Sequence, residues 1–178
     1  MRPLFSAAAI LAALAAVAVA APGGEARTAV PGDGCLVIDG GFGNVTISLA
    51  RGVIFGRVQG ISAITVEDTN PADGSAAQVF GAGGKSVLSD GRTRYIGNQN
   101  NAPIRFKSHG AVKIKISDAE LLDLSVVGKG SALLSSGSFD VTPNTYSVDA
   151  TSFCQDNFQP FPPSGAKPVK ASISSPTS

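Results

Sequence analysis

Apolar and polar residues alternate with a period of two along the middle of this chain. Val45, Ile47 and Leu49 alternate with hydroxyl side chains, and Ile114 and Ile116 alternate with lysines. Successive side chains of a β-strand point to opposite faces, so this period is typical of strands that bury one face. No stretch keeps a helical stripe of apolar residues for three turns. The alternation therefore predicts an all-β fold.

Glycines separate the predicted strands at intervals typical of turns. They stand at Gly43, Gly52, Gly60, Gly74, Gly91, Gly110 and Gly130. The clearest tight hairpin is Asp90-Gly91, which has apolar residues on both sides. About nine or ten short strands joined in this way predict a single antiparallel β-sandwich or small barrel. A β-solenoid is the alternative, because segments 64–68 and 114–118 are similar, although their spacing is not repeated a third time.

The first twenty residues differ from the rest of the chain. Arg2 is their only charge, and an alanine-rich apolar run ends in Ala18-Val19-Ala20, the small residues that a signal peptidase reads. We therefore expect a signal peptide over residues 1–20 and a secreted or extracytoplasmic mature protein. A membrane anchor is the alternative, but the run is shorter than the roughly 20 residues that a span requires. We expect no transmembrane span after cleavage.

Composition divides the remainder into three parts. Residues 21–34 are rich in Ala, Gly, Pro and Thr and are predicted to be a flexible leader. The patterned β domain is expected over residues 35–158. Residues 159–178 are rich in Pro and Ser, and we expect them to form a disordered tail because such a composition buries little apolar surface.

Cys35 and Cys154 are the only cysteines, and they flank the patterned region. Two isolated cysteines in an oxidising compartment most often pair, so we expect a disulfide between them. Closing a loop of roughly 120 residues corresponds to about 4–5 kcal/mol in the chain-entropy model. Two thiols and a single histidine lack the fourth ligand of a usual metal site, so we expect neither a metal nor another cofactor.

Charge and motif content argue against several functions. Removing residues 1–20 takes away one cation and no acid, so the 14 Lys and Arg become 13 against 13 Asp and Glu. A neutral chain lacks the field of a nucleic-acid binder, and we expect no such partner. His109 is the only histidine, and no Gly-x-Ser-x-Gly motif occurs. The chain also lacks Trp, the usual sugar platform. We expect a protein that is not an enzyme; the alternative is an extracellular carboxylate-dependent hydrolase, for which Glu67 and Glu120 are the candidate acids.

The segment Asp68–Gly74 resembles the opening of a calcium loop. Oxygen-bearing side chains alternate there, but the spacing is one residue too long and Val79 stands where the closing Glu would be. Asp and Asn followed by Pro and Gly are also what a reverse turn requires. We interpret the segment as a turn, with a weak calcium site as the alternative.

The most specific surface feature is a set of paired cations. The pairs are Arg92 and Arg94, Arg105 and Lys107, and Lys113 and Lys115. Residues two apart on a strand share a face, and no acid occurs between Gly91 and Ser117. If the three segments form an antiparallel meander, all six charges share one face. One interpretation is a solvated face that keeps the protein soluble. The other, our functional hypothesis, is a non-enzymatic binding or structural module whose basic strand face contacts an anionic cell-envelope polymer or lipid headgroup.

Several blocks of the chain resemble recurring blocks in uncharacterised exported β proteins of actinobacteria. The blocks are Phe55–Gly60, Asp123–Gly130, Tyr95–Gly97, the strand around Phe106 and Tyr146–Asp149. The resemblance covers roughly Val53 to Pro163 and rests on glycine and β-branched patterns. The chain departs from that family in its cysteine pair and in Phe158 and Phe161, where Trp is more usual. The family has no assigned activity, so the resemblance implies export and a β fold and adds no chemistry.

Overall fold

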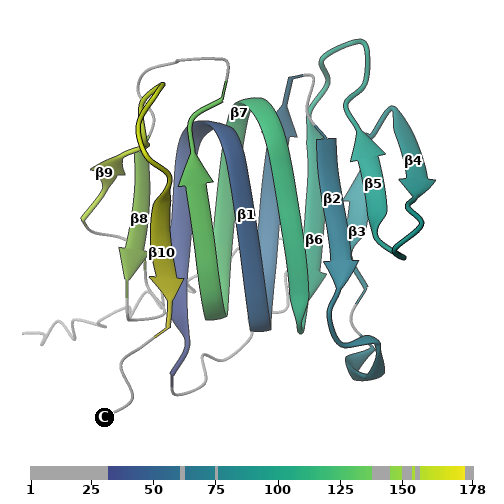
Figure 1. The fold of residues 1–178 in the computed structure, drawn as a ribbon, viewed down its shortest axis with the longest axis horizontal. Coiled ribbons are helices and arrows are strands. Elements are labelled where there is room, and N and C mark those ends of the chain that lie inside the picture. Colours follow the sequence, from purple (N-terminus) through teal and green to yellow (C-terminus); the bar gives the residue numbers. More distant parts are fainter. Residues whose placement is uncertain are drawn as a thin grey trace, which may run out of the picture.

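The structure, a computed structural model, describes residues 32–60, 63–74, 76–137, 145–149, 154 and 157–174. These residues form one antiparallel sheet of ten strands and a short 3-10 helix (Figure 1). The strands are β1 (Gly34–Gln59), β2 (Ala63–Asp68), β3 (Gln78–Phe80), β4 (Gly84–Val87), β5 (Thr93–Ile96), β6 (Ile104–His109), β7 (Val112–Ser135), β8 (Thr145–Asp149), β9 (Gln159–Pro160) and β10 (Val169–Ile173), and the helix is η1 (Pro71–Asp73).

Two strands are much longer than the others and bend back on themselves. β1 has 26 residues and β7 has 24. The register divides β1 into β1a (34–41), β1b (44–49) and β1c (52–59), and β7 into β7a (112–117), β7b (119–128) and β7c (130–135). One bend of β1 is at Gly43, where φ is 87° and an added Cβ would lie 2.1 Å from the nitrogen of Gly137. Only glycine fits that bend, because a side chain would meet backbone there.

These bends fold the sheet into two facing layers (Figure 1). Strand pairing gives a front layer in the order β10–β7c–β1b–β7a–β2–β5–β4. It gives a rear layer in the order β9–β8–β1a–β7b–β1c–β6–β3. The predicted all-β antiparallel architecture is confirmed, and the two facing layers are the arrangement of a sandwich. The ten strands agree with the nine or ten expected, although β1 and β7 are long because each runs through both layers.

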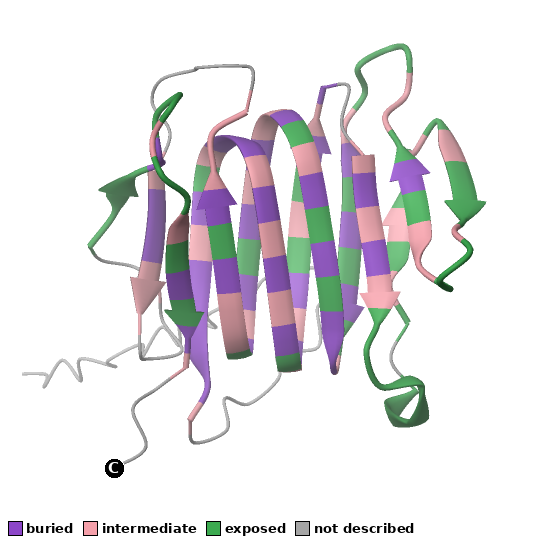
Figure 2. Ribbon diagram, in the orientation of Figure 1, coloured by how far each residue is buried: buried purple, intermediate pink, exposed green. Residues whose placement is uncertain are grey.

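Buried and exposed residues alternate along the strands of both layers (Figure 2). In β1b, Val45 and Ile47 are completely buried, and in β7a, Ile114 and Ile116 are equally buried. The core thus lies between the layers, and the polar residues that separate these side chains face outward. The predicted Asp90-Gly91 hairpin is also confirmed: it joins β4 to β5, and Gly91 has a φ of 83°.

The two halves of the sheet are related by a pseudo-twofold axis. β1a, β1b, β1c and β2 pass through the rear, front, rear and front layers, and β6, β7a, β7b and β7c repeat that path. Each half then adds one strand to the rear layer, β3 or β8, and one to the front layer, β5 or β10. Leu36 pairs with Val126 and Val58 pairs with Ile104, so residues of β1a and β1c correspond to residues of β6 and β7b that lie 68 positions later. The chain is therefore two similar β coils wound around each other.

The C-terminal segment as far as residue 174 belongs to the fold, so the predicted disordered tail over residues 159–178 was wrong for residues 159–174; residues 175–178 lie outside the described residues. β10 pairs with β7c along five residues, and Ile173 is completely buried. The Phe161 ring lies 5.5 Å from the Phe42 ring and 6.3 Å from the Tyr146 ring, measured between centroids. The folded unit therefore continues past residue 158 to at least Ile173. Apolar side chains between the prolines supply enough buried surface to order this segment.

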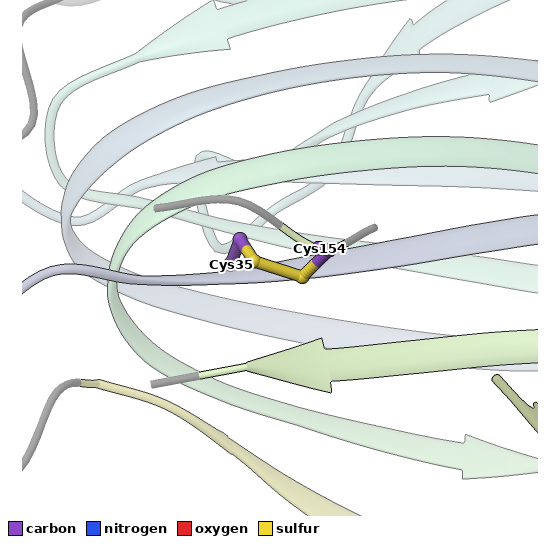
Figure 3. Close-up of a disulfide and its surroundings, with 2 residues drawn as sticks. All are labelled: Cys35 and Cys154. Carbon is purple, nitrogen blue, oxygen red and sulfur yellow. A yellow bond between two sulfur atoms is a disulfide. The ribbon is translucent and has the colours of Figure 1, made fainter. Parts of the chain in front are cut away.

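The predicted disulfide between Cys35 and Cys154 is present (Figure 3). The two Cα atoms are 5.8 Å apart, and the bond joins the start of β1 to the segment that follows β8. The predicted signal peptide and residues 21–31 of the predicted leader lie outside the described residues. The last residues of that leader are part of the fold, because the buried Asp33 carboxylate accepts a hydrogen bond from Arg51 Nε at 2.8 Å.

Candidate functional site

The outer surface of the rear layer carries aromatic and cationic side chains in adjacent positions. β6 buries Ile104, Phe106 and Ser108, so Arg105 and Lys107, which alternate with them, point outward. Arg105 is flanked by Phe80 on β3 and by Arg57 on β1c. Lys107 is flanked by Gln78 and by Phe55 on the same two strands. Each cation of β6 therefore has one aromatic neighbour, Phe80 beside Arg105 and Phe55 beside Lys107, on opposite sides of the strand.

A shallow open groove of about 690 Å³ follows this surface, and we call it the rear groove. It is lined by Val37, Ile38, Asp39, Phe55, Gly56, Arg57, Phe80, Arg105, Phe106, Lys107, Asp123, Leu124, Ser125 and Phe158. Its volume lies within the range of about 300–1,000 Å³ that small-molecule sites occupy. The groove crosses the rear layer from β3 to β1a, and Phe158 lines it from the segment just before β9.

Three phenylalanines in the rear groove are unusually exposed. Phe55, Phe80 and Phe158 are 43%, 58% and 45% exposed. Single exposed apolar residues are common on protein surfaces, whereas a group of them in one depression indicates a binding surface. The three rings come from three separate parts of the chain, and only the fold brings them together.

The charges in the rear groove are unequally compensated. Arg57 lies 3.7 Å from an Asp123 oxygen, and it donates a 3.5 Å hydrogen bond to Gln59. Arg105 and Lys107 have no ion pair or side-chain hydrogen bond with any other described residue. Both are exposed, and their nearest strand neighbours on the outer surface include Arg57. The β6 side of the groove therefore favours an anion.

The six paired cations do not share one face, because the predicted meander was wrong. β5, β6 and β7a are not successive neighbours: β5 pairs with β2 and β4, and β6 pairs with β1c and β3. The chain leaves the front layer after β5 and enters the rear layer with β6. Arg105 and Lys107 lie on the rear face, whereas Arg94, Lys113 and Lys115 lie on the front face.

The sixth cation, Arg92, belongs to the hairpin between β4 and β5. Its guanidinium forms an ion pair with Asp90, including a 2.8 Å hydrogen bond from Nε. The side-chain hydrogen bond from Arg92 lowers the pKa of Asp90 below its usual value, and the same bond raises the pKa of Arg92. Arg92 is therefore engaged locally by Asp90.

The front face offers cations without aromatic partners. Lys113 stands opposite Glu67 on one side and Ser48 on the other. Lys115 stands between Thr65 and Thr46 in the next row. Hydroxyl side chains and one carboxylate surround these lysines, as on an ordinary solvated strand face. The rear groove is therefore the better candidate site.

The candidate acids of a hydrolase lie far apart. Glu67 pairs with Lys113 near the start of β7a, in the front layer. Glu120 follows the bend at Asp118, in the rear layer, and accepts a hydrogen bond from Asn101 at 3.1 Å. Five residues of strand separate Lys113 from Asp118, or about 16 Å at the usual rise per residue. Glycosidase carboxylates stand within about 10 Å of each other, so these two do not form such a pair.

The other candidate residues have structural surroundings. Asp68 accepts a hydrogen bond from the Asn70 nitrogen at 3.0 Å, and Asp73 accepts one from the Ala111 nitrogen at 3.0 Å. The loop thus has the hydrogen bonds of a turn. No group of three metal-ligating side chains occurs among the residues that the structure describes. His109 is exposed at the end of β6 and is followed by the turn at Gly110.

A second hollow of about 830 Å³ lies beside the loop that follows β5. Two of the four side-chain amides that line it, those of Asn98 and Asn101, have hydrogen-bond partners. Asn98 binds the Gly81 and Ala102 carbonyls, and Asn101 binds Glu120. Among the described residues, its lining contains the Glu120 carboxylate and no cation, so it suits an anion less well than the rear groove does.

The aromatic half of the rear groove and its third cation, Arg57, were not predicted from the sequence. Phe55 and Arg57 alternate with the buried Ile54 and Val58, so the period of two already placed them on the outer face. Phe80 and Phe158 carried no comparable signal, since Phe80 ends a strand of three residues and Phe158 lies outside any strand, just before β9.

The comparisons with known proteins leave the fold and the site without a relative. No family model matches the chain, and no significant match was found among curated proteins or solved structures. The resemblance to exported actinobacterial β proteins therefore stays a prediction. None of the helical structure in the described residues is long and apolar enough to cross a membrane.

Proposed function

We propose that this chain is an exported, non-catalytic β module that attaches to anionic material of the cell envelope through the rear groove. Export rests on the predicted signal peptide over residues 1–20, and the disulfide between Cys35 and Cys154 is compatible with an oxidising compartment. The observation that carries the binding role is the pair of cations, Arg105 and Lys107, which β6 presents to an open groove.

Electrostatics and desolvation both support this location. Like charges on adjacent strands repel each other, and Arg57 adds a third cation beside the unpaired two. An anionic ligand removes that repulsion and gains hydrogen bonds to the guanidinium groups. The exposed phenylalanines beside the cations exclude water from part of the contact, and this strengthens the attraction.

Two double variants of equal charge change test the proposal. Arg105→Glu with Lys107→Glu alters the rear groove, and Lys113→Glu with Lys115→Glu alters the front face. We expect the wild-type protein to sediment with isolated cell envelopes at low salt and to be released as salt screens the contact. We expect the rear variant to lose this association and the front variant to keep it.

The outcomes distinguish the site from the function. Equal loss in both double variants would mean that general charge, and not the groove, controls association. No association of the wild-type protein at any salt concentration would overturn the proposed function. Circular dichroism and thermal melting of each variant confirm that the fold is intact.

A further inference from the structure

We infer that the rear groove binds a single anionic amphiphile, with its headgroup at Arg105 and Lys107 and its hydrocarbon chain across Phe55. This inference rests on the proposed function and narrows it to one ligand class. A polymer with charges alone would need only the cations. The exposed rings are unfavourable in water, and a ligand with its own apolar part covers them.

The register defines a path for such a ligand. Lys107, Phe55, Ser125 and Val37 stand side by side on four successive strands of the rear layer. The path begins at a cation and continues over an aromatic ring to an aliphatic side chain. Three strand spacings give it a length of about 14 Å. The headgroup and the first part of an alkyl chain extend over such a distance.

The pseudo-twofold axis shows that this arrangement is not a requirement of the fold. Asp39 corresponds to Lys107, and Asp123 corresponds to Phe55, 68 positions later or earlier in each case. Equivalent places in the other half of the groove thus carry carboxylates. The backbone accommodates either kind of side chain at these equivalent positions. The cations and rings in one half of the groove are therefore not needed for folding, and we assign them to ligand binding.

The same asymmetry orients the ligand. Asp39 and Asp123 both line the groove on the side of β1a and β7b. They repel an anionic headgroup from that side and favour its position on β6, near Arg105. The chain then points toward Phe158, which lines the far part of the groove and is 45% exposed.

The test compares a complete anionic amphiphile with two partial probes, one that has only the alkyl chain and one that has only the anionic group. Dodecyl phosphate, dodecyl maltoside and inorganic phosphate are titrated separately into the full mature protein below their micelle concentrations, with calorimetric readout. We expect one dodecyl phosphate per protein, bound at least about tenfold more tightly than either partial probe, a difference of about 1.4 kcal/mol.

A matched pair of variants locates the contact. Phe55→Ser removes a 43% exposed ring from the groove, and Leu133→Ser removes a 44% exposed apolar residue from the front face. We expect Phe55→Ser to weaken dodecyl phosphate binding by about tenfold or more, and Leu133→Ser to leave it unchanged. Equal effects of the two variants would overturn the inference.

Further outcomes separate this inference from the proposed function. Salt-sensitive binding to envelopes without dodecyl phosphate binding would refute the amphiphile and leave the envelope role standing. Binding to phosphatidylglycerol vesicles but not to monomeric dodecyl phosphate would replace the single molecule with a bilayer surface. Absence of binding to envelopes, vesicles and all three probes would overturn both proposals.

Discussion

Gly56 shows how one missing side chain shapes the rear layer. It pairs with Phe106 on β6, and an added Cβ would lie 2.1 Å from the Phe106 ring. The ring therefore lies over the glycine and fills the core beside it. The same strand carries Phe55 and Arg57 on its outer face, so packing at Gly56 also supports the groove.

We expect Gly56→Ala to lower the free energy of unfolding by about 1–3 kcal/mol, because the Phe106 ring must leave its position. Denaturant titration measures the change. Gly84→Ala is the control, since the nearest atom to its added Cβ is Ile96 Cδ1 at an ordinary 3.9 Å. We expect that control to be neutral or slightly stabilising. A loss of the same size in both variants would contradict the packing argument.

At the scale of single elements, substitutions in the C-terminal segment measure how much this segment contributes to the stability of the fold. Phe161 is 1% exposed, whereas Phe158, three residues earlier, is 45% exposed. We expect Phe161→Ala to lower the free energy of unfolding by about 3–5 kcal/mol, because it leaves a cavity beside Phe42. Phe158→Ala should change stability by about 0.5 kcal/mol at most. Similar denaturation midpoints for the two variants would show that the segment does not contribute to the core.

The strands with clear alternation were predictable, and the C-terminal ones were not. Val169, Ala171 and Ile173 do alternate, but the composition of prolines and serines around them indicated disorder. β9 and β10 lie at the edges of their layers, where proline is tolerated because one side of the strand has no partner. The prediction of disorder therefore followed the overall composition of the segment and not its short alternation of apolar residues, which was the correct signal.

The sequence pattern could not predict which strands pair with each other. Alternation reports that a strand has a buried face, but it does not report which strand lies beside it. Arg94 and Arg105 are close in sequence, yet they lie on opposite faces because the chain changes layer between β5 and β6. Half of the candidate site was predictable for the same reason: Arg105 and Lys107 were identified as outward cations, but their aromatic neighbours come from distant strands.

At the scale of the whole molecule, the disulfide closes a loop between residues separated by 119 positions. We expect replacement of both cysteines by serine to lower the free energy of unfolding by about 2–5 kcal/mol, mainly because the unfolded chain gains freedom. Denaturant titration of the double variant measures this loss, and reduction of the wild-type protein should reproduce it. An unchanged midpoint in both experiments would mean that the bond adds no stability.

The two wound coils also determine when this chain can fold. Leu36 pairs with Val126 and Val58 pairs with Ile104, so β1 has few pairing partners within its own half of the chain. Such a high contact order makes folding slow, because the entropy of closing long loops is lost before strand pairing can stabilise the structure. The first half of the chain can therefore complete neither layer until the second half has arrived. A chain whose second half is still missing cannot complete the sheet. Both layers therefore form together, after the whole chain is present.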